Sequence, residues 1–216
     1  MKYPLIVFDW DGTLLDSAAA IVHAIQAACR DLGLPAPDDR RARHVIGLGL
    51  ADAMRHVAPD LKPEQIQSMA ERYRHHYLSG DHQLTLFPGV PEMLARLRAD
   101  GHRLAVATGK SRLGLERALD HSGLRPYFLA SRCADECHSK PHPQMLLELL
   151  DELAIAAEST LMIGDTTHDL LLAKNAGVDA LAVTYGAHPL ASLLEHQPLA
   201  TLYSVPALDQ WLRAHA

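Results

Sequence analysis

The chain has 216 residues, of which 48% are hydrophobic and 21% charged, and its formal net charge is −6. This length and composition suit a globular protein with one domain and an insertion, or with two small domains. Without a cluster of Lys and Arg the sequence does not indicate a nucleic-acid-binding protein, and without an apolar run of ~18 residues or a signal peptide it indicates a cytoplasmic protein with no membrane partner.

The first predicted element is the apolar run at residues 4–8, which ends at acidic residues and glycine. A run this short suits a buried parallel strand better than a helix. Similar runs follow at residues 104–107, 128–131, 160–163 and 181–184, and helical patterns separate them. Strands that alternate with helices predict an α/β fold, in which helices cover both faces of a parallel sheet.

Residues 16–86 interrupt this alternation, because they carry helical patterns and no convincing strand. Asp16 or Ser17 can cap a helix that stops at Gly33, and Pro63 suits the first position of a later helix. A structureless loop of this length would be unusual. We therefore expect an α/β core domain at residues 1–15 and 87–216, with a helical domain inserted at residues 16–86.

The first strand is followed directly by Asp9, Asp11 and Gly12. Gly12 permits a tight turn whose backbone N–H groups can face an anion. A calcium loop of the EF-hand type would need a Glu at the twelfth position from Asp9, where Ala20 stands. Trp10, between the two aspartates, is expected to point into apolar packing.

The second strand ends at Thr108 and Gly109, within a Gly-Lys-Ser sequence. A phosphate loop would need a glycine five residues before Gly109, where Leu104 stands, so this interpretation is rejected. The Thr108 hydroxyl and the Gly109 N–H can still donate to a phosphoryl group, although a threonine here could equally cap a helix. Lys140, after the third strand, can add a cation to an anionic site or be an ordinary surface charge.

The fourth strand is followed by Asp165 and Asp169, which one helical turn brings to the same side. The carboxyl ends of parallel strands meet at one edge of the sheet, so we expect these aspartates to lie near Asp9 and Asp11. Carboxylates at such distances raise one another's pKa unless a cation intervenes. Oxygen ligands favour a hard cation, and the sequence therefore predicts a Mg²⁺ site.

In this order, the four signals resemble the motifs of the haloacid dehalogenase superfamily, and most closely its phosphoglycolate phosphatase-like branch with a small helical cap. The motifs stand at Asp9-x-Asp11-Gly12-Thr13, at Thr108, at Lys140 and at Gly164-Asp165-x-x-x-Asp169. The resemblance covers nearly the whole chain and implies a Rossmann-like sheet with an all-helical cap.

The resemblance also implies a Mg²⁺-dependent phosphatase that acts on a small phosphorylated metabolite. Asp9 would be the nucleophile that carries a phospho-aspartate intermediate, and Asp11 would protonate the leaving group and then activate water. The remaining implied roles are phosphate binding and catalysis by Thr108 and Lys140, phosphate binding by Gly12 and Gly109, and metal binding by Asp9, the Asp11 carbonyl, Asp165 and, directly or through water, Asp169.

Related activities are separated by Asp11, because haloalkanoate dehalogenases and phosphonate-cleaving members of the superfamily lack this second aspartate. A sugar-phosphate mutase keeps it and stays an alternative, as does a nucleotidase or a pyrophosphate-cleaving enzyme. Phosphonate cleavage would also need a cap lysine, and the insertion holds only Lys62. The oligomeric state is left open between monomer and homodimer.

Residues 45–50 resemble the branch's substrate-specificity loop, and Gly47 and Gly49 would permit close backbone approach. A plain helix connector is an alternative interpretation. Arg43 and His44 are candidates to meet a carboxylate or hydroxyl of the substrate, or are simply solvated. Cys133, Cys137 and His138 lack the spacing and second pair of a zinc site, and their role is left open.

Overall fold

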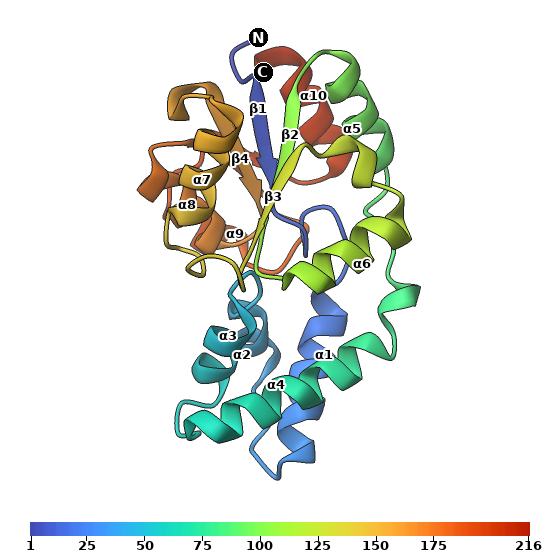
Figure 1. Ribbon diagram of the computed structural model, residues 1–216, viewed down its shortest axis with the longest axis vertical. Coiled ribbons are helices and arrows are strands. Elements are labelled where there is room, and N and C mark those ends of the chain that lie inside the picture. The colour runs from blue at the N-terminus through green and yellow to red at the C-terminus, as the bar shows by residue number, and fades with distance from the viewer.

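The computed structural model describes residues 1–216 and contains a parallel sheet above a group of four helices in the view of Figure 1. The sheet has six strands in the order β3-β2-β1-β4-β5-β6, and every neighbouring pair is parallel. The strands are β1 (Leu5–Phe8), β2 (Arg103–Thr108), β3 (Ala130–Cys133), β4 (Thr160–Gly164), β5 (Asp179–Val183) and β6 (Thr201–Leu202). This is the strand order of the doubly wound Rossmann fold, in which ligands bind where the order reverses beside β1.

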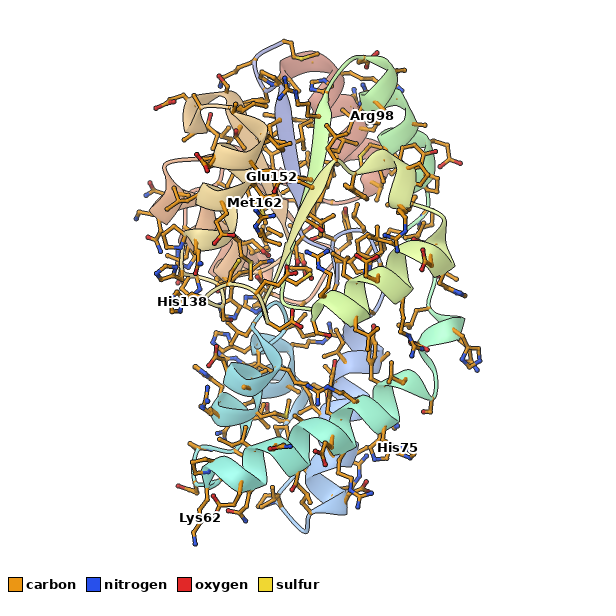
Figure 2. The ribbon with its side chains drawn as sticks, viewed as in Figure 1. Lys62, His75, Arg98, His138, Glu152 and Met162 are labelled. Carbon is orange, nitrogen blue, oxygen red and sulfur yellow. The ribbon has the colours of Figure 1, made fainter.

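Alternate residues of the strands face opposite sides of the sheet, as strand geometry requires. Ile6 and Phe8 pack in the core cluster that includes α5 (Val90–Ala99), α6 (Arg112–Ser122) and α10 (Val205–His215). Leu5 and Val7 pack in a second cluster with α7 (Gln144–Leu153) and α8 (Thr167–Ala176). Met162 of β4 lies within this second layer (Figure 2). The predicted α/β fold with helices on both faces is confirmed.

The remaining short elements are α9 (Leu190–Leu194) and three 3₁₀ turns at Asp81–Gln83, Arg125–Tyr127 and Ala157–Ser159. Two of the observed strands begin at other residues than predicted. β3 starts two residues later than expected, because the 3₁₀ turn before it ends at Tyr127 and Phe128 packs against the core. β5 starts two residues earlier, at Asp179, whose carboxylate accepts a hydrogen bond from the Tyr3 hydroxyl at 2.6 Å. No helix is both long and apolar enough to cross a bilayer.

Four helices occupy most of the chain between β1 and α5: α1 (Ala18–Asp31), α2 (Asp39–His44), α3 (Leu50–Val57) and α4 (Pro63–Leu78). They enclose their own cluster of 17 buried residues, to which the sheet part contributes only Ala187. The chain crosses between the two parts twice, side by side, with hydrogen bonds from Asp16 N–H to the Thr85 carbonyl and from Phe87 N–H to the Leu14 carbonyl, both 3.0 Å. We propose that residues 16–86 form a separate cap domain that meets the sheet domain at these crossings.

Lys62 is exposed at the end of the cap that lies opposite the sheet (Figure 2). The only lysine of the insertion therefore lies away from the carboxyl ends of the strands. This position agrees with the sequence argument against a cap lysine that forms a Schiff base.

Trp10 is fully buried, and its ring meets Phe128 edge to face with the ring centroids 6.3 Å apart. It thus points into apolar packing, as expected. Trp10→Ala should lower the free energy of unfolding by about 3–5 kcal/mol, because it empties a large core site. Trp10→Phe should cost much less, since it keeps a ring and removes an indole N–H that has no hydrogen-bond acceptor. Urea denaturation measures both, and equal losses would contradict this account of the packing.

Candidate active site

Asp9 continues the β1 ladder with a hydrogen bond from its N–H to the Ile163 carbonyl at 2.9 Å, and its side chain is fully buried. The turn after it depends on Gly12, which has φ +81°. A Cβ at Gly12 would lie 2.2 Å from Oδ2 of Asp165, closer than atoms can approach. Glycine at this position therefore lets the loops after β1 and β4 come together.

The loops bring three buried carboxylates into one group. Ligand oxygens of Asp9, Asp165 and Asp169 all lie within 4.8 Å of one another. The fourth predicted acid, Asp11, is nearby but its side chain is not a member of this group. Its predicted metal contact is through the backbone carbonyl, so the side chain is free for another role.

Lys140 lies between two of these acids, with Nζ 2.8 Å from Asp9 Oδ1 and 2.6 Å from Asp169 Oδ1. Its side chain is fully buried. Burial alone would lower the pKa of Lys140, but the adjacent Asp169 and Asp9 carboxylates outweigh it and hold the pKa above its usual value. Lys140 is therefore a fixed positive charge in the centre of the acidic group.

Burial raises the pKa of Asp9 to about 7, against the opposing effect of Lys140. Apart from the ion pair with Lys140, neither carboxylate oxygen of Asp9 receives a hydrogen bond of good geometry. A buried carboxylate without donors is costly, so the site lacks positive charge at this position. The donor set, which is all oxygen, fits Mg²⁺ at Asp9 and Asp165.

The other two carboxylates are held by the chain itself. Asp165 accepts hydrogen bonds from the Thr13 hydroxyl at 2.8 Å and the Ala187 N–H at 2.7 Å, while burial raises its pKa well above the usual value. Asp169 accepts from the N–H and hydroxyl of Thr166 in a capping box at the start of α8, and its other oxygen pairs with Lys140. Both oxygens of Asp169 are thus already engaged, which favours a metal contact through water over a direct one.

Two side chains contact the same carboxylate oxygen of Asp11. Oδ1 accepts a hydrogen bond from Ser17 at 2.7 Å and lies 3.1 Å from Nζ of Lys110. Of the two predicted capping residues, Ser17 and not Asp16 stands at the N-cap position of α1, but its hydroxyl makes no capping hydrogen bond because it binds Asp11 instead. Thr108 is buried at the end of β2, and its hydroxyl oxygen accepts from the Lys110 N–H at 3.2 Å.

The cap loop closes directly onto the core. The Gly49 N–H donates to the Ser139 hydroxyl at 2.8 Å, and a Cβ at Gly109 would lie 2.5 Å from the carbonyl oxygens of Gly47 and Leu48. A side chain at position 109 would therefore prevent this close approach of the cap loop to the core. This loop borders a cavity of about 430 Å³ between cap and core, which Asp11 also lines.

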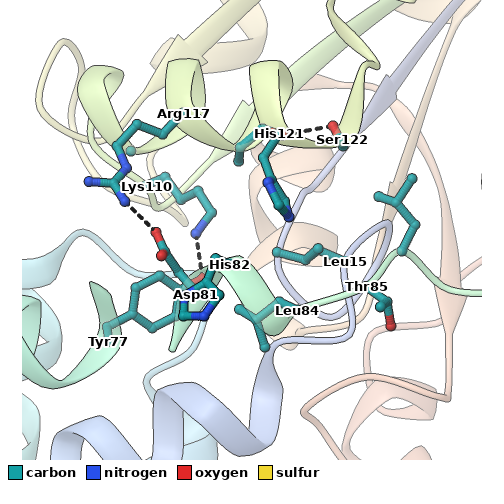
Figure 3. A pocket seen from close by; sticks show the side chains of 13 residues that line it. Leu15, Tyr77, Asp81, His82, Leu84, Thr85, Lys110, Arg117, His121 and Ser122 are labelled. Atoms are coloured by element: carbon teal, nitrogen blue, oxygen red, sulfur yellow. Dashed lines mark hydrogen bonds and ion pairs between the residues drawn. The ribbon is translucent and has the colours of Figure 1, made fainter. Parts of the chain in front are cut away.

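A second cavity, of about 310 Å³, lies beside the first, between the end of α4 and α6 (Figure 3). The two cavities share the side chains of Tyr77, Asp81, Lys110 and Arg117, two of which form an ion pair, Arg117 to Asp81 at 2.9 Å. The predicted substrate contacts Arg43 and His44 line neither cavity.

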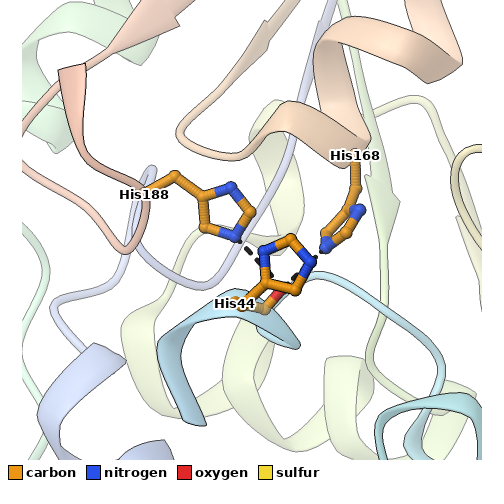
Figure 4. A group of neighbouring side chains, drawn as sticks. All are labelled: His44, His168 and His188. Carbon is orange, nitrogen blue, oxygen red and sulfur yellow. Dashed lines mark hydrogen bonds between the residues drawn. The ribbon is translucent and has the colours of Figure 1, made fainter. Parts of the chain in front are cut away.

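His44 instead contributes its backbone to a contact between cap and core (Figure 4). Its carbonyl oxygen accepts hydrogen bonds from Nε2 of His168 at 2.7 Å and from Nε2 of His188 at 3.2 Å. Nδ1 of His188 accepts from the Thr167 N–H at 3.1 Å, so the proton of this ring is on Nε2. Burial lowers the pKa of His188 to about 4, which keeps the ring neutral. Sequence spacing gave no signal for this cluster, because its members come from three separate segments.

Comparison with known proteins agrees with this geometry. The sequence profile described as haloacid dehalogenase-like hydrolase matches residues 6–183. The chain belongs to the haloacid dehalogenase-like hydrolases. Among its relatives are the "Probable phosphatase IndB" of Dickeya dadantii (41% identical, covering 90% of this chain and 87% of the relative), a 5'-nucleotidase of Pseudomonas aeruginosa (35%, 100% and 98%) and a phosphoglycolate phosphatase of Aliivibrio fischeri (35%, 90% and 89%).

The fold also matches a crystal structure described as a predicted phosphoglycolate phosphatase from Haemophilus somnus, with a TM-score of 0.87 and 23% identity over 100% of this chain and 99% of the other. This match shows the fold, and the sequence relatives place the chain in the phosphoglycolate phosphatase-like branch of the haloacid dehalogenase-like hydrolases. The enzyme is a phosphatase that hydrolyses phosphoric monoesters.

Gly109→Ala should keep the fold and the backbone N–H but hold the cap loop away from the core, because the added methyl would collide with two backbone oxygens. We expect kcat/KM to fall at least ~10-fold, since loss of closure admits bulk water and misplaces cap groups. Gly80→Ala is the matched control, because its Cβ would meet no atom within 4 Å. Wild-type kcat/KM in Gly109→Ala would show that activity does not need this contact.

Titration of Asp9 should also make the stability of the metal-free protein depend on pH. Its folded-state pKa of about 7 exceeds the unfolded value of 3.8, so its contribution to stability is full below pH ~4 and is lost as the pH rises to about 7. At about 1.4 kcal/mol per pH unit, this interval corresponds to roughly 4 kcal/mol. In EDTA, the stability of Asp9→Asn relative to wild type should therefore rise between about pH 4 and pH 7 and level off above pH 7.

Thermal melting at several pH values measures this difference. Added Mg²⁺ should raise the melting temperature of wild type at pH 8 and that of Asp9→Asn much less, because only the wild type offers the buried carboxylate. Parallel pH profiles for the two proteins would mean that Asp9 does not titrate in this range.

Proposed function

We propose that this phosphatase hydrolyses a small, phosphoglycolate-like phosphomonoester with the help of Mg²⁺, through a phospho-aspartate intermediate, an acyl phosphate formed on Asp9. The observation that carries this proposal is the position of Asp9: a buried carboxylate without hydrogen-bond donors, beside Lys140 and Asp165, where the strand order of the sheet reverses. This is the position at which a doubly wound sheet binds its ligand.

In the first step, one oxygen of Asp9 attacks phosphorus in line while the bond to the ester oxygen breaks. Asp11 gives its proton to the leaving oxygen. In the second step, Asp11 takes a proton from water, the water attacks phosphorus, and the Asp9 carboxylate and inorganic phosphate are released. The cavity that Asp11 lines is the position for the leaving group.

The charge of the transferring group spreads over its outer oxygens, and the chain supplies positive and polar groups to meet it. Lys140 already bonds Asp9 and would reach the phosphoryl group from there. The Thr108 hydroxyl and the N–H groups of Gly12 and Gly109 would donate hydrogen bonds. Magnesium, held by Asp9, the Asp11 carbonyl, Asp165 and, through water, Asp169, would supply further positive charge at the phosphoryl oxygens when bound.

The cap is proposed to select the leaving group. Gly47 and Gly49 belong to the loop that closes on the core, and both line the cavity of about 430 Å³ between cap and core. A cavity of this size suits a small metabolite better than nucleic acid or folded protein. Arg43 and His44 stay predictions as substrate contacts, although neither side chain lines the cavity.

Two neighbouring activities are distinguished by their products. A nucleotidase is favoured by the 5'-nucleotidase relative and by a cavity of about 430 Å³, which exceeds what a two-carbon acid fills. A mutase would return an isomeric sugar phosphate instead of inorganic phosphate. A panel of phosphoglycolate, sugar phosphates and nucleoside monophosphates, assayed for free phosphate with Mg²⁺ and with EDTA, identifies both substrate and reaction.

Asp9→Asn should lower phosphate release by more than about 10³-fold with the best substrate of this panel, because no other group replaces the nucleophile. Asp16→Asn is the matched control, since Asp16 is exposed in the same segment and its side chain makes no hydrogen bond or ion pair. EDTA should stop the wild-type reaction and Mg²⁺ should restore it. Phosphate release by Asp9→Asn at the wild-type rate, or full activity without metal, would overturn the proposed function.

A further inference from the structure

Lys110 is a largely buried lysine to which the mechanism above assigns no role. It follows β2 in the Gly-Lys-Ser sequence, and its side chain retains 10% exposure. Its Nζ lies 3.1 Å from Oδ1 of Asp11 and donates a hydrogen bond to the hydroxyl of Tyr77 at 3.0 Å. Figure 3 shows this amine directed at Tyr77, which belongs to the cap helix α4. Lys110 thus bonds the proton-transfer residue of the core on one side and the cap on the other.

The contacts of Asp11 indicate how the ion pair with Lys110 acts on the Asp11 carboxylate. Both groups that hold its carboxylate, Ser17 and Lys110, bind Oδ1. Oδ2 receives no hydrogen bond from the chain, and Asp11 lines the larger cavity, so Oδ2 is the oxygen available to a leaving group there. Fixing one oxygen of a carboxylate sets the direction of the other, and proton transfer is sensitive to such direction.

The orientation of the Lys110 side chain depends in turn on the cap. A lysine side chain has several rotatable bonds, and one ion pair near a cavity does not restrict it fully. Tyr77 adds a hydrogen bond, and its ring centroid lies 4.8 Å from the lysine Nζ, within the range of a cation–π contact. Tyr73 stacks on Tyr77 with centroids 5.8 Å apart and restrains the tyrosine ring. These restraints act on Lys110 only while the cap is closed.

We propose that Lys110 is a positioning residue that couples closure of the cap to the orientation of Asp11, with Tyr77 as its partner in the cap. The inference rests on the proposed function, in which Asp11 protonates the leaving oxygen. When the cap opens, Lys110 loses Tyr77 and Asp11 loses a fixed orientation. The acid is therefore aligned only over an enclosed substrate, which disfavours phosphate transfer in an open site.

The test uses leaving groups that differ in their need for a proton. An alkoxide must be protonated as it leaves, whereas p-nitrophenolate leaves without a proton. We compare kcat/KM for the fastest alkyl phosphate of the substrate panel with kcat/KM for p-nitrophenyl phosphate, because this constant reports the steps up to the first transfer. Lys110→Met should lower the alkyl value by about 10–100-fold and the aryl value by less than about 3-fold.

Tyr77→Phe removes only the hydroxyl and should show the same pattern with a smaller loss on the alkyl substrate. The double variant should be no slower than Lys110→Met alone, because the tyrosine acts through the lysine. Lys174→Met, at an exposed position of α8, is the matched control and should leave both values unchanged. Inhibition by inorganic phosphate should be the same in all variants.

Asp11→Asn serves as the reference, because it removes the acid itself. It should show the largest difference between alkyl and aryl substrates. If Asp11→Asn slows both equally, the acid role in the proposed function fails. If Asp11→Asn discriminates while Lys110→Met slows both substrates equally or neither, the function stands and the coupling is overturned. Should Lys110→Met not fold, Tyr77→Phe decides by the same comparison.

Discussion

The repulsion among buried carboxylates at the carboxyl edge of the sheet constrains the rest of this structure. Asp9, Asp165 and Asp169 have oxygens within 4.8 Å of one another and almost no contact with water. The chain supplies one buried ammonium group, that of Lys140, and hydrogen bonds to Asp165 and Asp169, but it leaves Asp9 without hydrogen-bond donors. In the proposed function a bound cation would offset the remaining cost, so the same arrangement that weakens the metal-free fold would prepare Asp9 as the nucleophile.

The close packing of these carboxylates requires a glycine in the loop after β1. A side chain at Gly12 would occupy the place of the Asp165 carboxylate, so glycine lets the loops after the two central strands lie against each other. Those strands, β1 and β4, are hydrogen-bonded neighbours where the strand order reverses. The chain leaves opposite faces of the sheet on either side of this point, and the crevice outside the strand ends there is where ligands bind in such folds. The sheet topology therefore determines where the acidic side chains meet, and Gly12 allows the two loops that carry Asp9 and Asp165 to approach each other closely.

Sequence reasoning could predict the features that depend on residues close together along the chain. Apolar runs followed by aspartate identified β1 and β4, and with them the convergence of Asp9 with Asp165. Polar contacts between distant segments left no such signal. Ser17 looked like a helix cap, yet its hydroxyl binds Asp11. The Gly-Lys-Ser sequence suggests at most a phosphate loop for Lys110, because nothing in the sequence indicates that residues 11, 77 and 110 meet. The shifts of β3 and β5 have the same origin, since a 3₁₀ turn and the Tyr3 contact override the apolar pattern.

The contacts between cap and core are of a kind that can break and re-form. The apolar clusters of the two parts are separate except for Ala187, so opening the cap exposes little of either core. What joins them is polar: Gly49 to Ser139, the carbonyl of His44 to His168 and His188, Lys110 to Tyr77, and Arg117 to Asp81. Each such contact contributes on the order of 1 kcal/mol, because water replaces it when it opens. Several such contacts together favour the closed form, yet the cap can still open to admit the substrate and release phosphate. One of these contacts, between Lys110 and Tyr77, is also linked to Asp11 through the Lys110 amine.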